Sequence, residues 1–244
     1  MTQALLFGVV SGFSLLFGAI VGVVFKLSQR AIARFMAFGA GVLICALTFG
    51  LMDEAFAHGG FDAVVIGFLL GGAVFIAGDY LLHIKGGRRH KRKPLAEPKV
   101  DTESGKVITL GAVLDGIPES IALGISLFGT GGQSLLVLAA ISLSNFPEGI
   151  SSIEGLRREG FSKAKIYAMW TSVAVVVSLC TVAAYFFLHN VDLNTLGIIE
   201  AFAAGAILAM LADSLMPEAF EDGGFSIGIV TVLGFLTAFI ISKI

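Results

Sequence analysis

Apolar residues in this chain come in long runs rather than in the one-sided pattern of a helix or strand that faces water. A hydrocarbon core of ~30 Å requires ~20 residues of helix, and eight runs approach that length. They lie at residues 4–25, 32–55, 61–83, 107–128, 133–156, 164–188, 195–219 and 224–242. The pattern predicts an all-α membrane protein with eight transmembrane helices, in a single transmembrane domain over residues 1–244.

Composition supports this interpretation and excludes an ordinary soluble domain. Hydrophobic residues make up 56% of the chain and charged residues 14%, whereas soluble domains are about a quarter charged. Cys45 and Cys180 both fall inside apolar runs. A structural disulfide is therefore not expected, and the two thiols are predicted to be small core residues.

The basic residues lie almost entirely on one set of connections. Fifteen of the 16 Lys and Arg fall in or beside the connections after the first, third and fifth runs, and only Lys243 lies elsewhere. The positive-inside rule then places these connections in the cytoplasm and both termini outside a plasma or inner membrane. Topology also explains the basic segment 84–106, predicted to be a cytoplasmic loop, so nucleic acid is not an expected partner.

Two distant segments of the chain are internal copies of each other. Residues 37–61 and 201–225 align without a gap, and 13 of the 25 aligned pairs are identical. The second and seventh spans are five crossings apart, so the copies run in opposite directions. This predicts an inverted-topology repeat of spans 1–3 and 6–8 around spans four and five, in a 3+2+3 arrangement. Inverted-topology repeats recur in secondary transporters.

The repeat places an acidic residue at each mouth of the predicted bundle. Glu54 ends the second span on the outer side, and its aligned partner Glu218 ends the seventh span on the inner side. They are either gates on an ion path or carboxylates that cap helix ends at the membrane surface. The further acidic residues assigned to the path are Asp53, Asp213 and Glu154.

The most informative residues are two Pro-Glu pairs inside spans four and five. Counting ~1.5 Å per residue puts Glu119 and Glu148 near the middle of the bilayer. An ionisable residue at that depth is costly and marks a functional site by default. Helical spacing adds three polar residues to the same volume: Asp115 lies four residues from Glu119, Ser144 four from Glu148, and Asn145 one turn from Glu148.

These residues predict a cation site. Pro118 and Pro147 also free the backbone carbonyls of Leu114 and Leu143, which lipid tolerates only beside a polar cavity or a partner. Repulsion among several carboxylates requires a compensating cation, and a divalent metal ion is the simplest. A lone Pro-Glu would more often be a kink with a protonated acid, but two related copies at matching depth argue against that alternative.

At these positions the sequence resembles the ZIP family of divalent-metal transporters. The stretches that carry the resemblance are 115–119 and 144–148, together with the span endings Met52-Asp-Glu-Ala55 and Met216-Pro-Glu-Ala219. The resemblance implies eight spans, outward termini, a cytoplasmic loop after span three, a homodimer, and transport of zinc, iron or manganese.

The chain departs from that family in its ligand chemistry. Asp115 and Ser144 stand where the family commonly has histidine, Gly116 where it commonly has asparagine, and Gly50 where a span-two histidine often lies. The usual Glu-Pro of span six is absent. One site is therefore expected rather than two, with Asp115, Glu119, Asn145 and Glu148, together with Ser144 and water, as ligands.

An all-oxygen site favours harder ions such as manganese, magnesium or calcium. Carboxylates also bind zinc well, so zinc, manganese, iron and cadmium all stay open as cargo. No resident cofactor is predicted.

Import by alternating access is the favoured function. An enzyme is not expected, since the chain has neither a His-Glu-x-x-His motif nor a Tyr-Asp partner for Asp79. The alternatives left open are a metal-gated channel, a proton-coupled carrier of organic cations and a metal sensor.

Overall fold

The computed structural model describes residues 1–84, 104–129 and 132–243, and all regular structure in them is helical. The predicted loop 84–106 lies almost wholly outside these residues. The helices, with two short π-helical turns, are α1 (Thr2–Val24), α2 (Gln29–Ala46), η1 (Leu47–Met52), α3 (Asp53–Ile84), α4 (Ser104–Ser126), α5 (Gln133–Arg158), α6 (Lys163–Leu188), α7 (Leu193–Met210), η2 (Leu211–Leu215), α8 (Met216–Gly223) and α9 (Ser226–Ile241).

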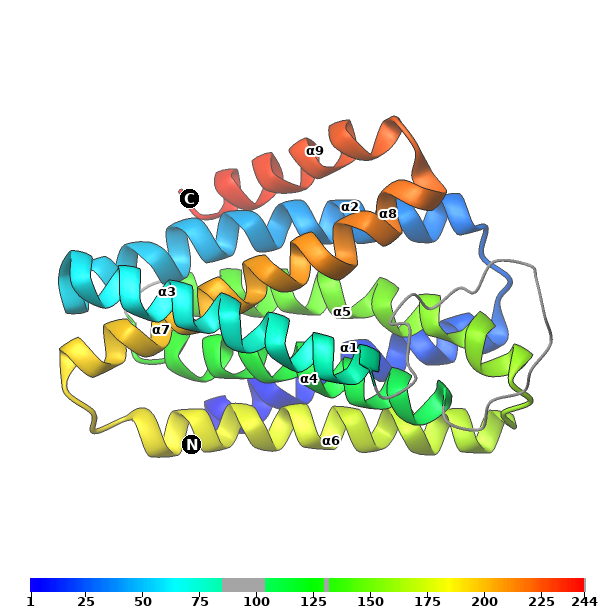
Figure 1. Cartoon of the computed structure of the whole chain (residues 1–244), viewed down its shortest axis with the longest axis horizontal. Coiled ribbons are helices and arrows are strands. Elements are labelled where there is room, and N and C mark those ends of the chain that lie inside the picture. The colour runs from blue at the N-terminus through cyan, green and yellow to red at the C-terminus, as the bar shows by residue number, and fades with distance from the viewer. Residues whose placement is uncertain (85–103, 130–131, 244) are drawn as a thin grey trace.

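Six helices in the described part of the chain are long and apolar enough to cross a membrane, which agrees with a multi-pass membrane protein. The longest, Gln29–Leu82, is not one straight rod. It reverses direction at Gly60, whose φ of 68° and ψ of −164° are non-helical, and α3 then runs back through the bundle packed on α7 (Figure 1). The last apolar helix, Ser226–Ile241, is shorter. The count of eight spans stays a prediction.

Polar residues at the ends of the apolar runs start several helices. The Ser28 hydroxyl accepts a hydrogen bond from the Ala31 amide at the start of α2 (3.3 Å). At the start of α7, Asp192 accepts from the amide of Thr195 (3.0 Å), and this bond holds the pKa of Asp192 below its usual range. Such side chains satisfy amides that have no partner within the helix, so these helix starts are set locally.

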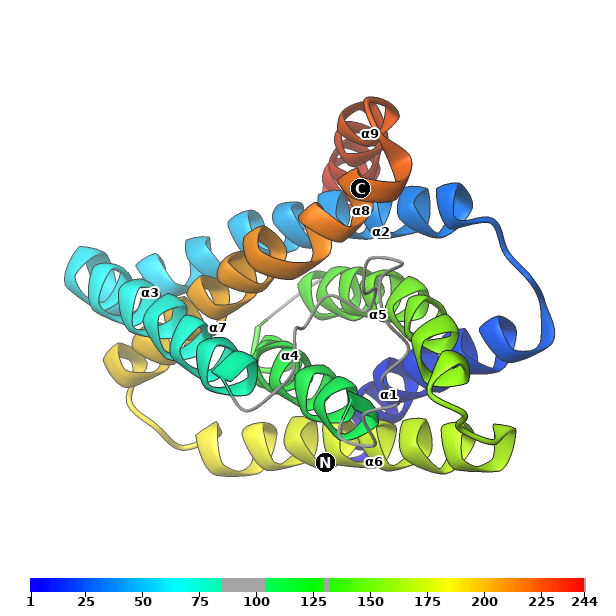
Figure 2. The same cartoon turned by 45° about the vertical axis from the view of Figure 1, so that its right-hand side comes forward.

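The two helices with the Pro-Glu pairs lie in the interior of the bundle. Helix α5 packs against α1 and α2, and α4 packs against α6 and α7. Both therefore lie between the group formed by α2, α3, α7 and α9 and the pair α1 and α6 (Figures 1 and 2). Helix α9 lies at the edge of the bundle, where it packs mainly on α2.

The helix pairs α3–α7 and α2–α9 are packed in the same way. A Cβ atom at Gly71 of α3 would lie 1.9 Å from the carbonyl oxygen of Phe202 on α7. A Cβ atom at Gly234 of α9 would lie 2.1 Å from the carbonyl oxygen of Phe38 on α2. Small residues allow membrane helices to approach this closely. Phe38 and Phe202 are aligned positions of the two sequence copies.

Other features also recur at aligned positions. The π-helical turns η1 and η2 both begin at the same aligned position, Leu47 in one copy and Leu211 in the other. Gly60 and Gly224 are aligned as well, and both have a positive φ, 68° and 60°. Each marks a reversal of the chain, and the two reversals lie at opposite ends of the bundle (Figure 1). We refer to these as the Gly60 end and the Gly224 end.

Candidate metal site

Glu119 on α4 and Glu148 on α5 are buried at the centre of the bundle. Their exposed fractions are 1% and 7%. Helices α4 and α5 contact each other, and each of the two residues lies well inside its helix. The antiparallel helices therefore bring together the two acidic residues of the Pro-Glu pairs, which are 29 positions apart in the chain.

The other three predicted ligands are buried on the same two helices. Asp115 on α4 is 6% exposed, and Ser144 and Asn145 on α5 are each 1% exposed. The amide nitrogen of Asn145 donates to the carbonyl oxygen (3.4 Å) and hydroxyl (3.3 Å) of Ser11 on α1. Because a cation binds oxygen and not an amide N–H, only the side-chain oxygen of Asn145 can serve as a ligand.

Glu119 has the most demanding surroundings of the five. Neither of its carboxylate oxygens has a hydrogen-bond partner among the described residues. A buried carboxyl group without a partner is costly in free energy, and a carboxylate more so. A bound cation would offset that cost and also the repulsion from Glu148.

Contacts with neighbouring helices fix the positions of α4 and α5. The Ser120 hydroxyl on α4 bonds the carbonyl of Gly116 (2.6 Å) and lies 3.1 Å from the carbonyl of Val177 on α6. On α5, the carbonyl of Leu143, which Pro147 frees, faces α2. A Cβ atom at Gly39 would lie 3.0 Å from it. That carbonyl therefore packs against a neighbouring backbone.

The carboxylates are not preassembled as a closed metal cage. Within the described ranges, no three His, Cys, Asp or Glu side chains are grouped closely enough to hold a metal ion. The site instead combines carboxylate oxygens with the polar side chains of Ser144 and Asn145. Such a site needs a small adjustment of its side chains when a cation binds.

The predicted path residues lie towards the two ends of the bundle. Asp53 is exposed and Glu54 half-buried near the Gly60 end, whereas Asp213 is exposed in η2 and Glu218 half-buried in α8, towards the Gly224 end. Glu154 accepts hydrogen bonds from Gln29 and Arg158. It therefore joins the end of α5 to the start of α2, and the structure gives it a connecting role.

Two polar residues near Glu54 were not singled out by the sequence analysis. Glu200 on α7 is 1% exposed, and its carboxylate lies 2.9 Å from Nδ1 of His58 on α3. Glu54 precedes His58 by about one helical turn on α3. Two features of the sequence could have identified them. Glu200 is an acidic residue within the apolar run of the seventh span, and His58 is a histidine four residues after Glu54.

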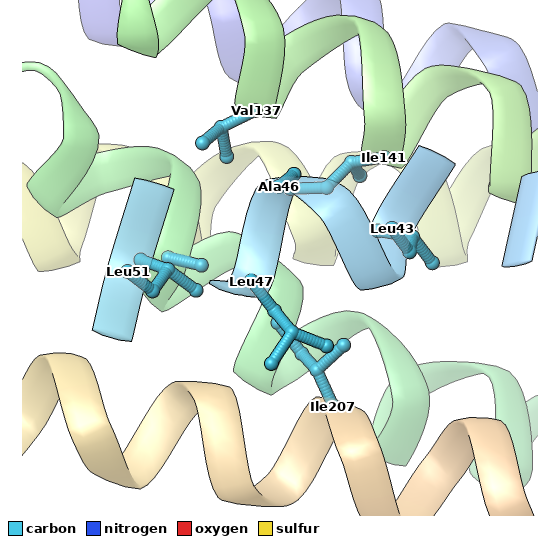
Figure 3. A pocket seen from close by; sticks show the side chains of 8 residues that line it. Leu43, Ala46, Leu47, Leu51, Val137, Ile141 and Ile207 are labelled. Atoms are coloured by element: carbon cyan, nitrogen blue, oxygen red, sulfur yellow. The ribbon is translucent and has the colours of Figure 1, made fainter. Parts of the chain in front are cut away.

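An apolar layer lies between these residues and the central carboxylates. A small cavity there is lined only by aliphatic side chains, from α2, η1, α4, α5 and α7 (Figure 3). The lining residues are Leu43, Ala46, Leu47, Leu51, Ala122, Val137, Ile141 and Ile207. On the side towards the Gly60 end, Leu51 is followed by Glu54 one helical turn later. On the opposite side, Ala122 is one turn from Glu119.

Comparison with known proteins gives one informative match. No family model matches the chain. A curated protein of Arabidopsis thaliana, described as a "putative zinc transporter", is 31% identical over 193 residues. The alignment covers 75% of this chain and 29% of the plant protein, so the chain spans less than a third of that protein's length.

Proposed function

We propose that this protein carries divalent metal cations, of the zinc, manganese or iron class, across a cell membrane. The observation that carries the proposal is the pair Glu119 and Glu148, two buried carboxylates on antiparallel helices, one of them without a hydrogen-bond partner in the described structure. The name of the plant relative points in the same direction.

The proposed binding site consists of Asp115, Glu119, Ser144, Asn145 and Glu148. Carboxylate and amide oxygens suit manganese and magnesium, but carboxylates also bind zinc and iron. The carboxylates would replace part of the hydration shell of the ion in the interior of the bundle. Water completes the coordination, because the side chains alone do not form a closed cage.

Transport proceeds by alternating access on an eight-span scaffold of inverted repeats. Support for the repeats comes from the aligned π-helical turns, from the positive φ at both Gly60 and Gly224, and from the matching packing of α3–α7 and α2–α9. Transporters with such repeats move one group of helices against the other around a fixed central site. Helices α4 and α5 with α1 and α6 form one group here, and the remaining helices form the other.

The apolar layer defines which side of the site is closed. It separates the central carboxylates from the Gly60 end, which would face the outside by the positive-inside rule. A cation would enter past Asp53 and Glu54 when this layer opens, and would leave towards Asp213, Glu218 and Glu154. Hydrated ions do not cross such a layer, because stripping water from them without replacement ligands costs too much free energy.

Uptake into proteoliposomes tests the proposal. Purified protein is reconstituted with a fluorescent metal indicator inside the vesicles, and Zn²⁺ or Mn²⁺ is added outside. We expect the double substitution Glu119→Ala/Glu148→Ala to lower the initial rate to that of protein-free vesicles, because the central site loses both paired carboxylates.

Two controls keep this test decisive. Glu221→Ala removes an exposed carboxylate on α8 and should leave uptake unchanged. Glu119→Gln/Glu148→Gln keeps the side-chain volume if the alanine variant does not fold. Undiminished uptake by a folded double variant would refute the central site. Binding of metal without any uptake by the unmodified protein would identify a sensor instead of a transporter.

A further inference from the structure

The residues around Glu54 at the Gly60 end form a second polar cluster, separate from the central carboxylates. Glu54 and His58 are four residues apart on α3 and therefore share one helix face. Glu200 approaches His58 from α7. The apolar layer lies between this cluster and Glu119, so the two groups do not belong to one site.

The contact between His58 and Glu200 orients the imidazole. An ionised carboxylate can only accept a hydrogen bond, so when Glu200 is ionised Nδ1 of His58 carries the hydrogen that it donates to Glu200. In a neutral imidazole Nε2 then keeps its lone pair. Metal-binding histidines commonly donate their other ring N–H to a carboxylate in this way, which fixes the tautomer and raises the basicity of the ligand nitrogen.

The exposure of the two partners agrees with these roles. The Glu200 side chain is 2% exposed, whereas that of His58 is 28% exposed. The orienting carboxylate is thus inside the protein, and the imidazole remains accessible from the Gly60 end. Glu54 is half-buried on the same helix face as His58, one turn earlier, so its carboxylate is the second ligand that a cation bound at Nε2 would recruit.

Close backbone packing holds this cluster in place. A Cβ atom at Gly197 of α7 would lie 2.7 Å from the carbonyl oxygen of Ala55 and 2.8 Å from the amide nitrogen of Gly59. The first turns of α3 therefore lie directly on α7, which brings Glu200 within reach of His58.

The same cluster does not occur at the other copy of the repeat. The residues aligned with Glu54 and His58 are Glu218 and Asp222, and Met36 is aligned with Glu200. One end of the pseudosymmetric scaffold therefore has an imidazole with a buried carboxylate behind it, and the other has neither at these positions. Packing symmetry alone does not explain the His58–Glu200 pair.

We propose that His58 and Glu54 form a docking site for a divalent cation of the zinc type at the Gly60 end, with Glu200 as the residue that orients His58. An imidazole and a carboxylate suit Zn²⁺ better than Mg²⁺ or Ca²⁺. Two protein ligands with water give weak binding, so the cation can be released towards the central site. Its role in uptake rests on the proposed transport function, but binding itself does not.

Equilibrium dialysis with Zn²⁺ alone tests the docking site in the full chain. The background variant is Glu119→Gln/Glu148→Gln, which removes the charge of the central site. We expect this variant to retain one weak Zn²⁺ site. Adding His58→Gln should lower the affinity at least ~tenfold, and adding Glu200→Gln should lower it ~10–100-fold, because outer partners of metal ligands have effects of that size.

His189→Gln is the matched control. This histidine is exposed, lies at the end of α6 and stacks on Tyr185, so its replacement should leave Zn²⁺ binding unchanged. A background variant that binds no Zn²⁺, or an affinity that His58→Gln does not change, would overturn the proposal. A purely structural pair would lower the unfolding temperature in Glu200→Gln while Zn²⁺ affinity stayed the same.

A second measurement uses the unmodified protein if the background variant does not fold. Modification of histidines by diethylpyrocarbonate is followed by peptide mass spectrometry, with and without Zn²⁺. We expect Zn²⁺ to protect His58 but not His189, and equal modification rates of His58 with and without Zn²⁺ would contradict the docking site.

In proteoliposomes, His58→Gln should raise the KM for Zn²⁺ uptake and leave the maximal rate unchanged. If the unmodified protein binds Zn²⁺ at His58 but shows no uptake, the result would refute the proposed transport and leave the docking site standing.

Discussion

Individual residues in this protein have two distinct kinds of constraint. For the acidic residues the constraint is chemical, since Glu119 is buried without a hydrogen-bond partner in the described structure and Glu200 is buried with its carboxylate against His58. For Gly60 the constraint is conformational. Its backbone angles, φ 68° and ψ −164°, lie in a region that residues with a Cβ essentially do not adopt.

Gly60→Ala should destabilise the protein through the backbone alone. Nothing lies within 4 Å of the Cβ atom that would be added, so no clash contributes. We expect the free energy of unfolding in detergent to fall by ~1–3 kcal/mol, the range for residues held in such conformations. Unfolding curves of the purified protein measure this change.

Gly228→Ala on α9 is the control for this prediction. A Cβ atom there also has no neighbour within 4 Å, but the residue lies within a helix. Its free energy of unfolding should not decrease, since alanine is the better helix former. Equal losses in the two variants would show that backbone strain is not the cause.

Pairs of helices are held by backbone contacts that glycine permits. Helices α3 and α7 touch along Gly67, Gly71 and Gly205, and no side chain separates the backbones at these positions. Dispersion forces between closely packed atoms drive helix association in lipid, because lipid tails are as apolar as leucine. The α3–α7 pair also sets the position of Glu200 relative to His58.

Neighbouring glycines on α3 offer a sharp test of this packing. Gly71→Ala places a Cβ atom 1.9 Å from the carbonyl oxygen of Phe202, whereas Gly72→Ala places it 3.6 Å from the nearest atom, the carbonyl oxygen of Gly205. We expect the first variant to lose ~1–3 kcal/mol, the usual cost of overpacking. Thermal unfolding in detergent measures both variants, and the second should match the unmodified protein.

The result for Gly71→Ala also bears on function. If α3 and α7 are forced apart, the His58–Glu200 contact should weaken with them. A Gly71→Ala variant as stable as Gly72→Ala would contradict the close approach of the two helices.

At the scale of the whole molecule, basic residues gather at one end of the bundle. Lys26, Arg157, Arg158 and Lys163 lie in or beside the α1–α2 and α5–α6 connections, at the Gly224 end. Both termini are marked at the other end (Figure 1). The positive-inside rule therefore predicts that the Gly60 end faces the outside.

Cysteine labelling in intact cells tests this orientation. Cys45 and Cys180 are free and are first replaced by alanine. Asp62→Cys then adds an exposed thiol just after the Gly60 reversal, and Ser162→Cys adds one in the α5–α6 connection. We expect a membrane-impermeant maleimide to label Asp62→Cys at once, and Ser162→Cys only after the membrane is permeabilised. The opposite result would reverse the assignment of the two ends.

The sequence by itself determined the elements and the candidate ligands. Apolar runs and their polar ends act locally, so the helical structure follows from them, as the caps at Ser28 and Asp192 show. Helical spacing likewise placed Asp115 and Glu119 on one face of α4. The repeat was visible as sequence identity, although its consequence for the number of spans and the direction of transport stays a prediction.

Only the tertiary structure decided which residues meet across helices. His58 and Glu200 are 142 positions apart, and Asn145 and Ser11 are 134 apart. The apolar layer combines residues from α2, η1, α4, α5 and α7. Such contacts depend on the rotation and depth of each helix relative to its neighbours. Side-chain packing over the whole bundle sets these quantities, and the hydropathy of a single span contains little information about them.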